Sequence, residues 1–304
     1  MNSAILSVLL ISLSGFCYSA DSVVDDTELL LTFLIHRHGD RTPIESFLAM
    51  STHAEELEEA SAKYGYGQLT DVGKRRAYQL GQFIRRRYDE LLSPNFNKSE
   101  IYIRSTESTR AKMTVLTALA AVYPAPEDNW SQDVNWTPVP YTTVPAKYDF
   151  MSLGIPLDDD IAAIYPDIEK IAGVLLNQFF TVADQVIAGE DVQRVHIYSA
   201  HDVNVFAFEA ATKVVNPQGV PKYASAYALE LRKVVKTGDY IVVPTYLPTP
   251  SEDVIKYLEI EECGQRCAYE SFRSVTSNIV LDEDEWRTTC GFSNDMVIDT
   301  SSVD

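Results

Sequence analysis

The sequence predicts an α/β fold of three layers, in which helices cover both faces of a mostly parallel sheet. Three strand patterns, at residues 29–35, 101–103 and 194–200, each end in charged or polar residues. Patterns of helical period follow the second and third strands directly and the first strand after a loop. Strands that alternate with helices pair in parallel, so we expect these polar residues to meet at one carboxyl edge, where open α/β sheets bind ligands.

The first strand pattern, Leu29–Ile35, is apolar at nearly every position, which is typical of a strand buried on both faces. The segment 37–43 follows it and reads Arg-His-Gly-Asp-Arg-Thr-Pro. Its glycine permits a sharp or left-handed turn, and its proline cannot continue the strand pairing. Two guanidiniums beside an imidazole offer donors that match phosphate oxygens, so we predict an anion site at Arg37, His38 and Arg41.

A loop and a long helix are predicted next. Residues up to about Tyr66 are acidic, and we interpret them as a loop without a chemical role. Apolar residues then recur at three- and four-residue steps up to Leu91, which predicts an amphipathic helix with Thr70 as its N-cap. The opposite face carries arginines 85–87, which we interpret as a solvated helix face.

The second strand, 101–103, leads into two further arginines, Arg104 and Arg110. A helical pattern rich in Ala, Leu and Val begins at Lys112 and ends near Tyr123. Cationic residues therefore lie again between the end of a strand and the start of a helix. The residues alone leave open which of the two arginines joins the anion site.

The third strand, 194–200, delivers His201 and Asp202 to the same expected edge. A helical pattern over about 160–187 precedes this strand, and another over about 203–214 follows it. A His-Asp pair is a weak signal by itself. Three strands that all end in polar residues nevertheless favour one shared site.

The remaining segments predict a surface connection and a hairpin. Residues 124–145 are rich in proline, tryptophan and asparagine, which is typical of a connection that runs over the surface. Two later segments, near 227–234 and 240–246, alternate apolar with polar residues. We expect them to pair as a hairpin around residues 237–239.

The first 20 residues have the composition of a secretory signal peptide. Residues 4–16 are apolar apart from Ser and Gly, and small residues follow at 19–20. This apolar core is shorter than the roughly 20 residues that a membrane-spanning helix needs. We therefore expect an exported protein whose domain spans 21–304, and we expect no membrane anchor, because no second long apolar run exists.

The charge balance and the glycosylation sequons agree with an exported protein. The 44 acidic residues outnumber the 25 basic ones and give a net charge of −19, which argues against nucleic acid as a partner. Sequons at Asn97, Asn129 and Asn135 predict glycosylation on surface loops.

Three cysteines remain once the predicted signal peptide, with Cys17, is removed. The close spacing of Cys263 and Cys267 favours a small disulfide loop. Cys290 is then left over, which predicts a free thiol or an intermolecular bridge. A disulfide-linked homodimer is one expected outcome.

The segment 37–43, the arginine after the second strand and the His-Asp pair together resemble the motifs of the histidine acid phosphatases. In that family the motif histidine is the nucleophile, three arginines bind phosphate, and the His-Asp pair supplies a phosphate ligand and a proton donor. The family's Ser-Thr-x-x-x-Arg context selects Arg110 rather than Arg104. The resemblance implies His38 as nucleophile, Asp202 as proton donor, and Arg37, Arg41, Arg110 and His201 as phosphate ligands.

The resemblance covers about residues 28–145 and 190–292 and implies the histidine phosphatase fold. Family members carry a longer helical insert between these blocks, so residues 146–190 are expected to form a reduced helical cap. Family cysteines in that insert pair with one near the C-terminus, and their absence here leaves Cys290 unpaired. His36 is a smaller departure, because relatives usually have an apolar or aromatic residue there.

The resemblance implies a secreted acid phosphatase of broad phosphomonoester specificity, which forms a phosphohistidine on His38. Protonated carboxyl and histidine groups would give it an acidic optimum. No metal or cofactor is expected, because two cations flank His38 and no cysteine or carboxylate spacing completes a metal site. Secretion is favoured over the lysosomal lumen. The alternative is a secreted ligand-binding protein on the same fold with weak turnover or none.

Overall fold

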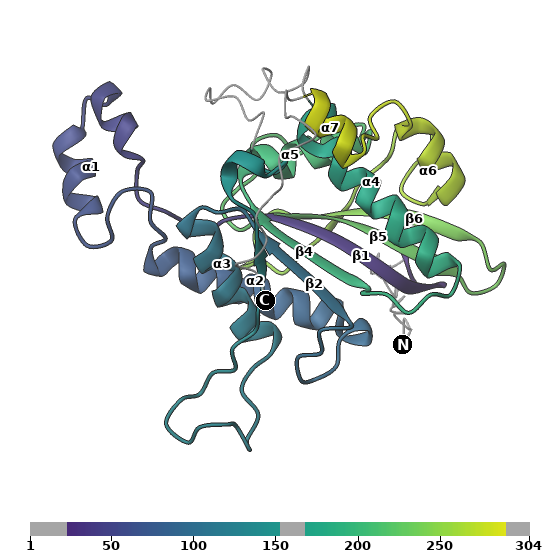
Figure 1. Cartoon of the computed structure of the whole chain (residues 1–304), viewed down its shortest axis with the longest axis horizontal. Helices are drawn as coiled ribbons and strands as arrows, with labels where there is room; N and C mark the ends of the chain where they lie inside the picture. The colour runs from purple at the N-terminus through teal and green to yellow at the C-terminus, as the bar shows by residue number, and fades with distance from the viewer. Residues whose placement is uncertain (1–22, 153–167, 290–304) are drawn as a thin grey trace, which may run out of the picture.

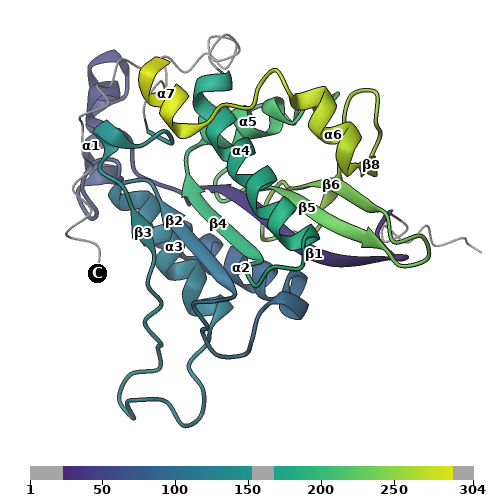
Figure 2. The same cartoon turned by 45° about the vertical axis from the view of Figure 1, so that its right-hand side comes forward.

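The computed structural model describes residues 23–152 and 168–289, and these form one sheet with helices on both faces (Figure 1, Figure 2). The strands are β1 (Thr27–Arg37), β2 (Ile101–Ser105), β3 (Thr142–Thr143), β4 (Val195–Ala200), β5 (Ala226–Val234), β6 (Tyr240–Leu247), β7 (Lys256–Tyr257) and β8 (Cys267–Ala268). The α-helices are α1 (Ala54–Ser61), α2 (Asp71–Arg87), α3 (Thr109–Val122), α4 (Ile168–Ile187), α5 (Asp202–Ala211), α6 (Tyr269–Thr276) and α7 (Glu283–Thr289). Short 3-10 helices lie at η2 (Glu45–Met50), η3 (Asp89–Leu91) and η4 (Ala146–Tyr148).

The strands follow the order β3-β2-β4-β1-β5-β6-β7, and β8 pairs with β6. From β3 to β1 all neighbours run parallel, and β5 begins an antiparallel extension on the other side of β1. All six residues of β4 are buried, as expected for a parallel strand covered on both faces. The three strands predicted first are therefore parallel neighbours, which confirms the α/β fold.

Two apolar clusters occupy the two faces of the sheet. Leu31 and Phe33 of β1 belong to the cluster that contains the buried sides of α4, α5 and α6. Leu34, whose side chain alternates to the opposite face, packs in the cluster with α2 and α3. Figure 1 shows these two sets of helices on opposite sides of the strands. The core is thus three layers thick, as predicted.

Two local predictions are confirmed in detail. Thr70 caps α2, because its Oγ1 accepts a hydrogen bond from the N–H of Gly73 at 3.2 Å. The predicted hairpin is formed by β5 and β6, which pair from Ala226 opposite Leu247 to Lys233 opposite Tyr240.

Arg87 corrects the interpretation of residues 85–87 as a solvated face. Its Nε and Nη2 donate to the two carboxylate oxygens of Glu230 at 2.8 and 2.9 Å. Glu230 is fully buried on β5, and it also pairs with Arg232 at 3.1 Å. A buried carboxylate needs such partners to offset its desolvation, so Arg87 is held against the edge of the core by this ion pair.

The predicted loop before Tyr66 is wrong in part, because it contains η2 and α1. Helix α1 is rich in Ala and Glu, and Glu55 and Glu56 lie in its first turn, where the helix dipole favours negative charge. The helix propensity of these residues therefore explains why α1 forms, although it has no apolar face that would have predicted a helix. Figure 2 shows α1 at the margin of the fold, away from the β5–β6 hairpin.

The expected cap, residues 146–190, also needs correction. Its main element, α4, buries Leu175, Leu176 and Phe179 in the core cluster and so forms part of a core layer. Residues 153–167 lie outside the described part, and with them the start of the helix expected from about 160. Helix α4 thus covers the sheet, whereas residues 146–152 lie at the carboxyl edge, where the N–H of Ala146 donates to Glu107 and Nδ2 of Asn204 donates to the carbonyl of Met151.

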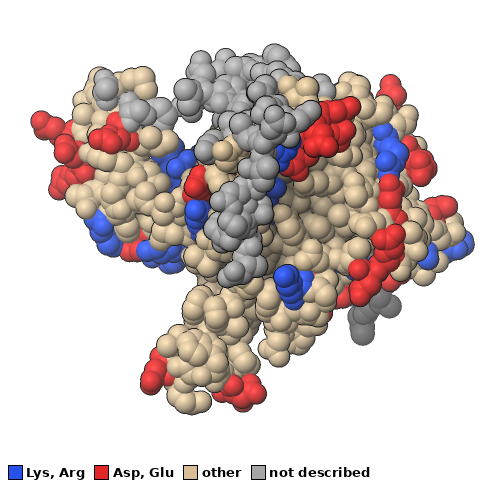
Figure 3. All heavy atoms as spheres, viewed as in Figure 1, with Lys and Arg blue, Asp and Glu red and all other residues tan. Residues whose placement is uncertain are grey.

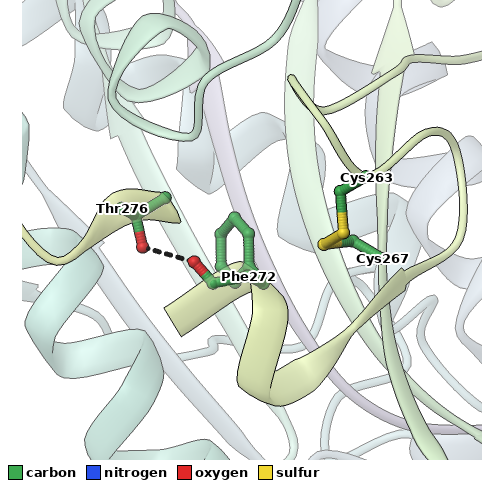
Figure 4. The surroundings of a disulfide bond; sticks show 4 residues. All are labelled: Cys263, Cys267, Phe272 and Thr276. Atoms are coloured by element: carbon green, nitrogen blue, oxygen red, sulfur yellow. Dashed lines mark hydrogen bonds between the residues drawn. A yellow bond between two sulfur atoms is a disulfide. The ribbon is translucent and has the colours of Figure 1, made fainter. Parts of the chain in front are cut away.

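Cys263 and Cys267 form a disulfide with their Cα atoms 5.0 Å apart, next to α6 (Figure 4). The predicted signal peptide, including Cys17, and Cys290 lie outside the described residues. Across residues 23–152 and 168–289, none of the helices combines the length and the apolar character that a membrane span requires.

Candidate active site

The carboxyl ends of β1, β2 and β4 bring the three predicted polar segments together. In the parallel register Arg37 lies opposite Ala200, and Ser105 lies opposite Ser199. The N–H of His38 donates to the carbonyl of Ala200 at 3.0 Å. Strand pairing alone therefore aligns the segment after β1 with the starts of α3 and α5.

His38 is held in one tautomer. Its side chain is buried, and Nδ1 lies 2.8 Å from the carbonyl oxygen of Gly39, which can only accept a hydrogen bond. Nδ1 therefore carries the proton, and Nε2 keeps a free lone pair. Burial lowers the pKa of His38 to about 2, with His201, Arg110 and Arg37 adding to the effect, so the ring stays neutral.

Gly39 is required for a different reason from the one predicted. The backbone of Gly39 does not have a positive φ, so no left-handed turn requires this glycine. A Cβ at this position would instead lie only 2.6 Å from the carbonyl oxygen of Gly73. A Cβ on Gly73 would in turn meet the carbonyl oxygen of Asp40 at 2.2 Å. The two glycines let the segment after β1 pack directly on the first turn of α2.

Arg37 is fixed from three sides. Its Nη2 lies 2.7 Å from Oδ2 of Asp202, and its Nη1 donates to the carbonyl of Pro221 at 2.7 Å. The ring of Tyr223 lies 4.1 Å from its Cζ. Its Nε is buried and has no hydrogen-bond partner within the described residues.

Arg41 and Arg110 complete a group of three guanidiniums. Arg41 donates to the carbonyl of Thr42 at 2.9 Å, and Nη2 of Arg110 lies 3.4 Å from Nδ1 of His201. Burial lowers the pKa of Arg110, and the charges of Arg41 and Arg37 lower it further. In the described part of the chain the Nε atoms of Arg41 and Arg110 are also buried without a partner. Such a group of converging cations favours an anion.

His201 is the N-cap residue of α5, and Asp202 opens the helix. Because Arg110 can only donate to Nδ1, the proton of His201 lies on Nε2, which contacts Oγ1 of Thr106 at 3.1 Å. Burial lowers the pKa of His201 to about 4, and Arg110 contributes to this shift. The expectation of protonated histidines therefore does not hold for the free site.

Arg104 lies elsewhere. It pairs with the buried carboxylate of Asp149 at 2.5 Å and stacks over Phe150 at 4.4 Å. Its charge is offset by Asp149, whereas Arg110 faces the group of cations and His201. The structure therefore places Arg110, not Arg104, among the residues around His38.

The sequence reasoning missed Tyr223 and Pro221, which lie in the connection between α5 and β5. No local signal marks them, because the residues they contact lie 184 and more positions earlier in the chain. Proline and glycine in that connection predict only a turn.

The predicted sequons lie on loops. Asn97 and Asn135 are exposed, and Asn129 is partly buried in the connection between α3 and β3. Among the described residues, no group of three or more His, Cys, Asp or Glu is arranged to hold a metal ion. Acidic side chains lie over separate parts of the surface, including the α1 region, in Figure 3. The arginines around His38 are thus a local exception in an acidic protein.

Residues 28–153 match the model of the histidine phosphatase superfamily (branch 2). Prostatic acid phosphatase of Bos taurus is 38% identical over 146 residues, which cover 47% of this chain and 36% of the relative. Prostatic acid phosphatase of Homo sapiens is 40% identical over 124 residues, which cover 40% of this chain and 31% of the relative. These matches span about a third of the relatives' length. Lysosomal acid phosphatase of Rattus norvegicus is 22% identical over 375 residues, which cover 95% and 86%.

Solved structures share the fold. The phytase from D. castellii has a TM-score of 0.57 at 13% identity and covers 90% of this chain and 84% of that one. The Klebsiella sp ASR1 phytase has a TM-score of 0.56 at 11% identity, and the match covers 84% of this chain and 97% of the phytase. These matches show that residues 28–153 are similar to the histidine phosphatase superfamily (branch 2) and that the chain shares the fold of these phytases.

Proposed function

We propose that the protein is an acid phosphatase that hydrolyses phosphate monoesters through a phosphohistidine on His38. One observation carries the proposal: the neutral, buried ring of His38, with its proton on Nδ1, lies 5.5 Å from the ring of His201 and within the influence of the charges of Arg37 and Arg110. A neutral imidazole is a competent nucleophile, and phosphoryl transfer otherwise needs mainly positioning and positive charge. The names of the matched relatives agree with this reaction class.

In the first step Nε2 of His38 attacks phosphorus, and the bond between phosphorus and the ester oxygen breaks. Arg37, Arg41 and Arg110 bind the phosphoryl oxygens and offset the charge of the transition state. His201 joins them when its Nε2–H exchanges Oγ1 of Thr106, its partner in the free site, for a phosphoryl oxygen. Asp202, protonated, donates its proton to the leaving alkoxide, which departs as an alcohol.

In the second step a water molecule attacks the phosphohistidine. Asp202, now a carboxylate, accepts a proton from this water, and the bond between phosphorus and Nε2 breaks. Inorganic phosphate leaves, and His38 returns to its neutral form. Because Asp202 must start the cycle protonated, this mechanism favours acidic pH, while both histidines remain neutral.

The same proposal includes export and processing. Residues 1–20 serve as a signal peptide, and 21–304 form the exported protein, whose substrates are small phosphomonoesters. Glycosylation at Asn97, Asn129 and Asn135 and pairing of Cys290 between two copies belong to this proposal.

The test is phosphate release from para-nitrophenyl phosphate between pH 4 and 8, with the exported chain and its His38→Ala variant. We expect activity on the acid side that disappears in the variant. His53→Ala is the matched control, because His53 is exposed and lies before α1. A folded protein that binds inorganic phosphate without turnover would instead support the ligand-binding alternative.

A further inference from the structure

Tyr223 borders the site without belonging to any of its motifs. It is half-buried in the connection that leads from α5 to β5. Its ring lies 4.1 Å from Cζ of Arg37, and its centroid lies 5.7 Å from that of His38 at an angle of 40°. One aromatic side chain therefore contacts both the nucleophile and a phosphate ligand of the proposed mechanism.

The contacts of Arg37 are of two kinds. Asp202 and the carbonyl of Pro221 each contact one of its terminal nitrogens. Tyr223 makes a cation–π contact instead, because Cζ of Arg37 lies over the face of its ring, 4.1 Å from the centroid. The remaining N–H groups, including the buried Nε, stay available in the plane for an oxyanion.

The backbone around Tyr223 is fastened to the strand that carries the site. Ala224 donates its N–H to the carbonyl of His38 at 3.0 Å, and the N–H of Arg37 donates to the carbonyl of Ser225 at 3.0 Å. The connection is thus joined both to Arg37, the last residue of β1, and to the backbone of His38 itself.

Ala224 also has a φ of +56°, in the left-handed region that a residue with a Cβ rarely adopts. Ala224 is fully buried, so this strained conformation is held by its surroundings. The left-handed conformation of Ala224 directs the backbone into β5, which begins two residues later, while the ring of Tyr223 lies against Arg37. A strained residue of this kind at a site indicates that the local geometry is functional.

We propose that Tyr223 is a positioning residue, which holds the guanidinium of Arg37 in the plane where its free N–H groups meet the phosphoryl oxygens. The inference deepens the proposed phosphatase function and rests on it. The hydroxyl has no part in it, since the face of the ring makes the contact. The ring acts through Arg37, so its effect should depend on Arg37 being present.

The test uses Tyr223→Leu, Tyr223→Phe and the control Tyr78→Leu, which removes an exposed tyrosine from α2. Inhibition by inorganic phosphate and KM for para-nitrophenyl phosphate are measured for each. We expect Tyr223→Leu to raise both constants about tenfold, the scale of a partly desolvated cation–π contact, while kcat changes less. Tyr223→Phe keeps the wild-type values, and so does Tyr78→Leu.

A double-mutant cycle with Arg37→Ala separates positioning from general damage. If Tyr223 acts through Arg37, Tyr223→Leu has little further effect on phosphate inhibition in the Arg37→Ala background. Additive losses, or an unchanged inhibition constant in a folded Tyr223→Leu protein, would overturn the inference. Tyr223→Gln, which removes the ring but keeps a polar side chain at this half-buried position, replaces Tyr223→Leu if that variant does not fold.

Calorimetric titration with inorganic phosphate keeps the inference separate from the phosphatase proposal. A wild-type protein that binds phosphate but lacks turnover contradicts the catalytic proposal alone, and about tenfold weaker binding by Tyr223→Leu then still supports the positioning role. If the wild type and Tyr223→Leu bind phosphate equally, or if the wild type does not bind phosphate, the positioning role of Tyr223 is overturned.

Discussion

The guanidinium of Arg37 and the carboxylate of Asp202 form an ion pair in the free site, with Nη2 and Oδ2 2.7 Å apart. In the proposed reaction these residues have separate tasks, since Arg37 binds the phosphoryl group and Asp202 moves a proton. An incoming phosphate therefore meets the N–H groups of Arg37 that Asp202 leaves free, close to the negative charge of the carboxylate. That charge opposes a bound anion, so the same residue that moves the proton also affects phosphate binding.

The variant Asp202→Asn tests this relationship. We expect inorganic phosphate to inhibit about threefold more strongly, because the negative charge of the partly exposed Asp202 no longer repels the bound anion. We expect kcat for an alkyl phosphate to fall by about 10² to 10⁴, because the general acid is lost. The loss should be smaller for para-nitrophenyl phosphate, whose leaving group needs no proton. Equal losses on both substrates would contradict the assignment of Asp202 as proton donor.

The variant Arg110→Met should weaken anion binding with little loss of stability. Arg110 forms no ion pair within the described residues, and its Nε is buried without a partner. Loss of its charged hydrogen bonds to phosphate should raise KM and the phosphate inhibition constant about 10- to 100-fold. Arg75→Met, on the exposed side of α2, is the matched control. An unchanged inhibition constant for phosphate in Arg110→Met would show that Arg110 is not a phosphate ligand.

The variant Arg104→Met should show the opposite behaviour. It leaves the fully buried Asp149 without its cation, so urea unfolding should show a loss of about 3–5 kcal/mol in the free energy of unfolding. The additional change Asp149→Asn should recover part of this loss, because the buried charge is removed. Phosphate inhibition of the folded protein stays near the wild-type value. If the Arg104→Met protein were as stable as the wild type but were inhibited only weakly by phosphate, Arg104 rather than Arg110 would be the phosphate ligand.

Buried neutral histidines should make the fold less stable in acid. Burial lowers the pKa of His36 from 6.5 to about 4. Below pH 6.5 the unfolded chain binds a proton that the folded chain does not, so stability falls as pH falls. Between pH 7.5 and 5 this histidine accounts for about 2 kcal/mol.

The variant His36→Leu should reduce the difference in unfolding free energy between pH 7.5 and 5 by that amount, whatever its effect at either pH. The measurement is urea unfolding at both pH values. His53→Leu, at an exposed position, should leave the difference unchanged. The same pH dependence in His36→Leu and wild type would show that His36 does not stay neutral in the fold.

Local patterns in the sequence were enough to predict the three units of strand, polar segment and helix, the cap at Thr70 and the β5–β6 hairpin. Each depends on local chemistry: apolar runs form buried strands, a threonine satisfies free N–H groups, and alternation marks paired strands. These patterns also predicted that His38, Arg37 and the His201-Asp202 pair meet, because parallel strands share their carboxyl edge.

The residue pattern left Arg104 and Arg110 as alternatives, only the family resemblance selected Arg110, and the tertiary structure gives the physical reason why the two separate. They lie six positions apart, but Asp149 pairs with the first in the core, while the start of α3 places the second beside His201. Arg87 likewise leaves the solvated face because β5 brings the buried Glu230 within reach of its guanidinium. Tyr223 reaches Arg37 across 186 positions of chain, counted as 223 − 37. Such contacts depend on long-range pairing and on the cost of burying charge, and neither is written in the local pattern of residues.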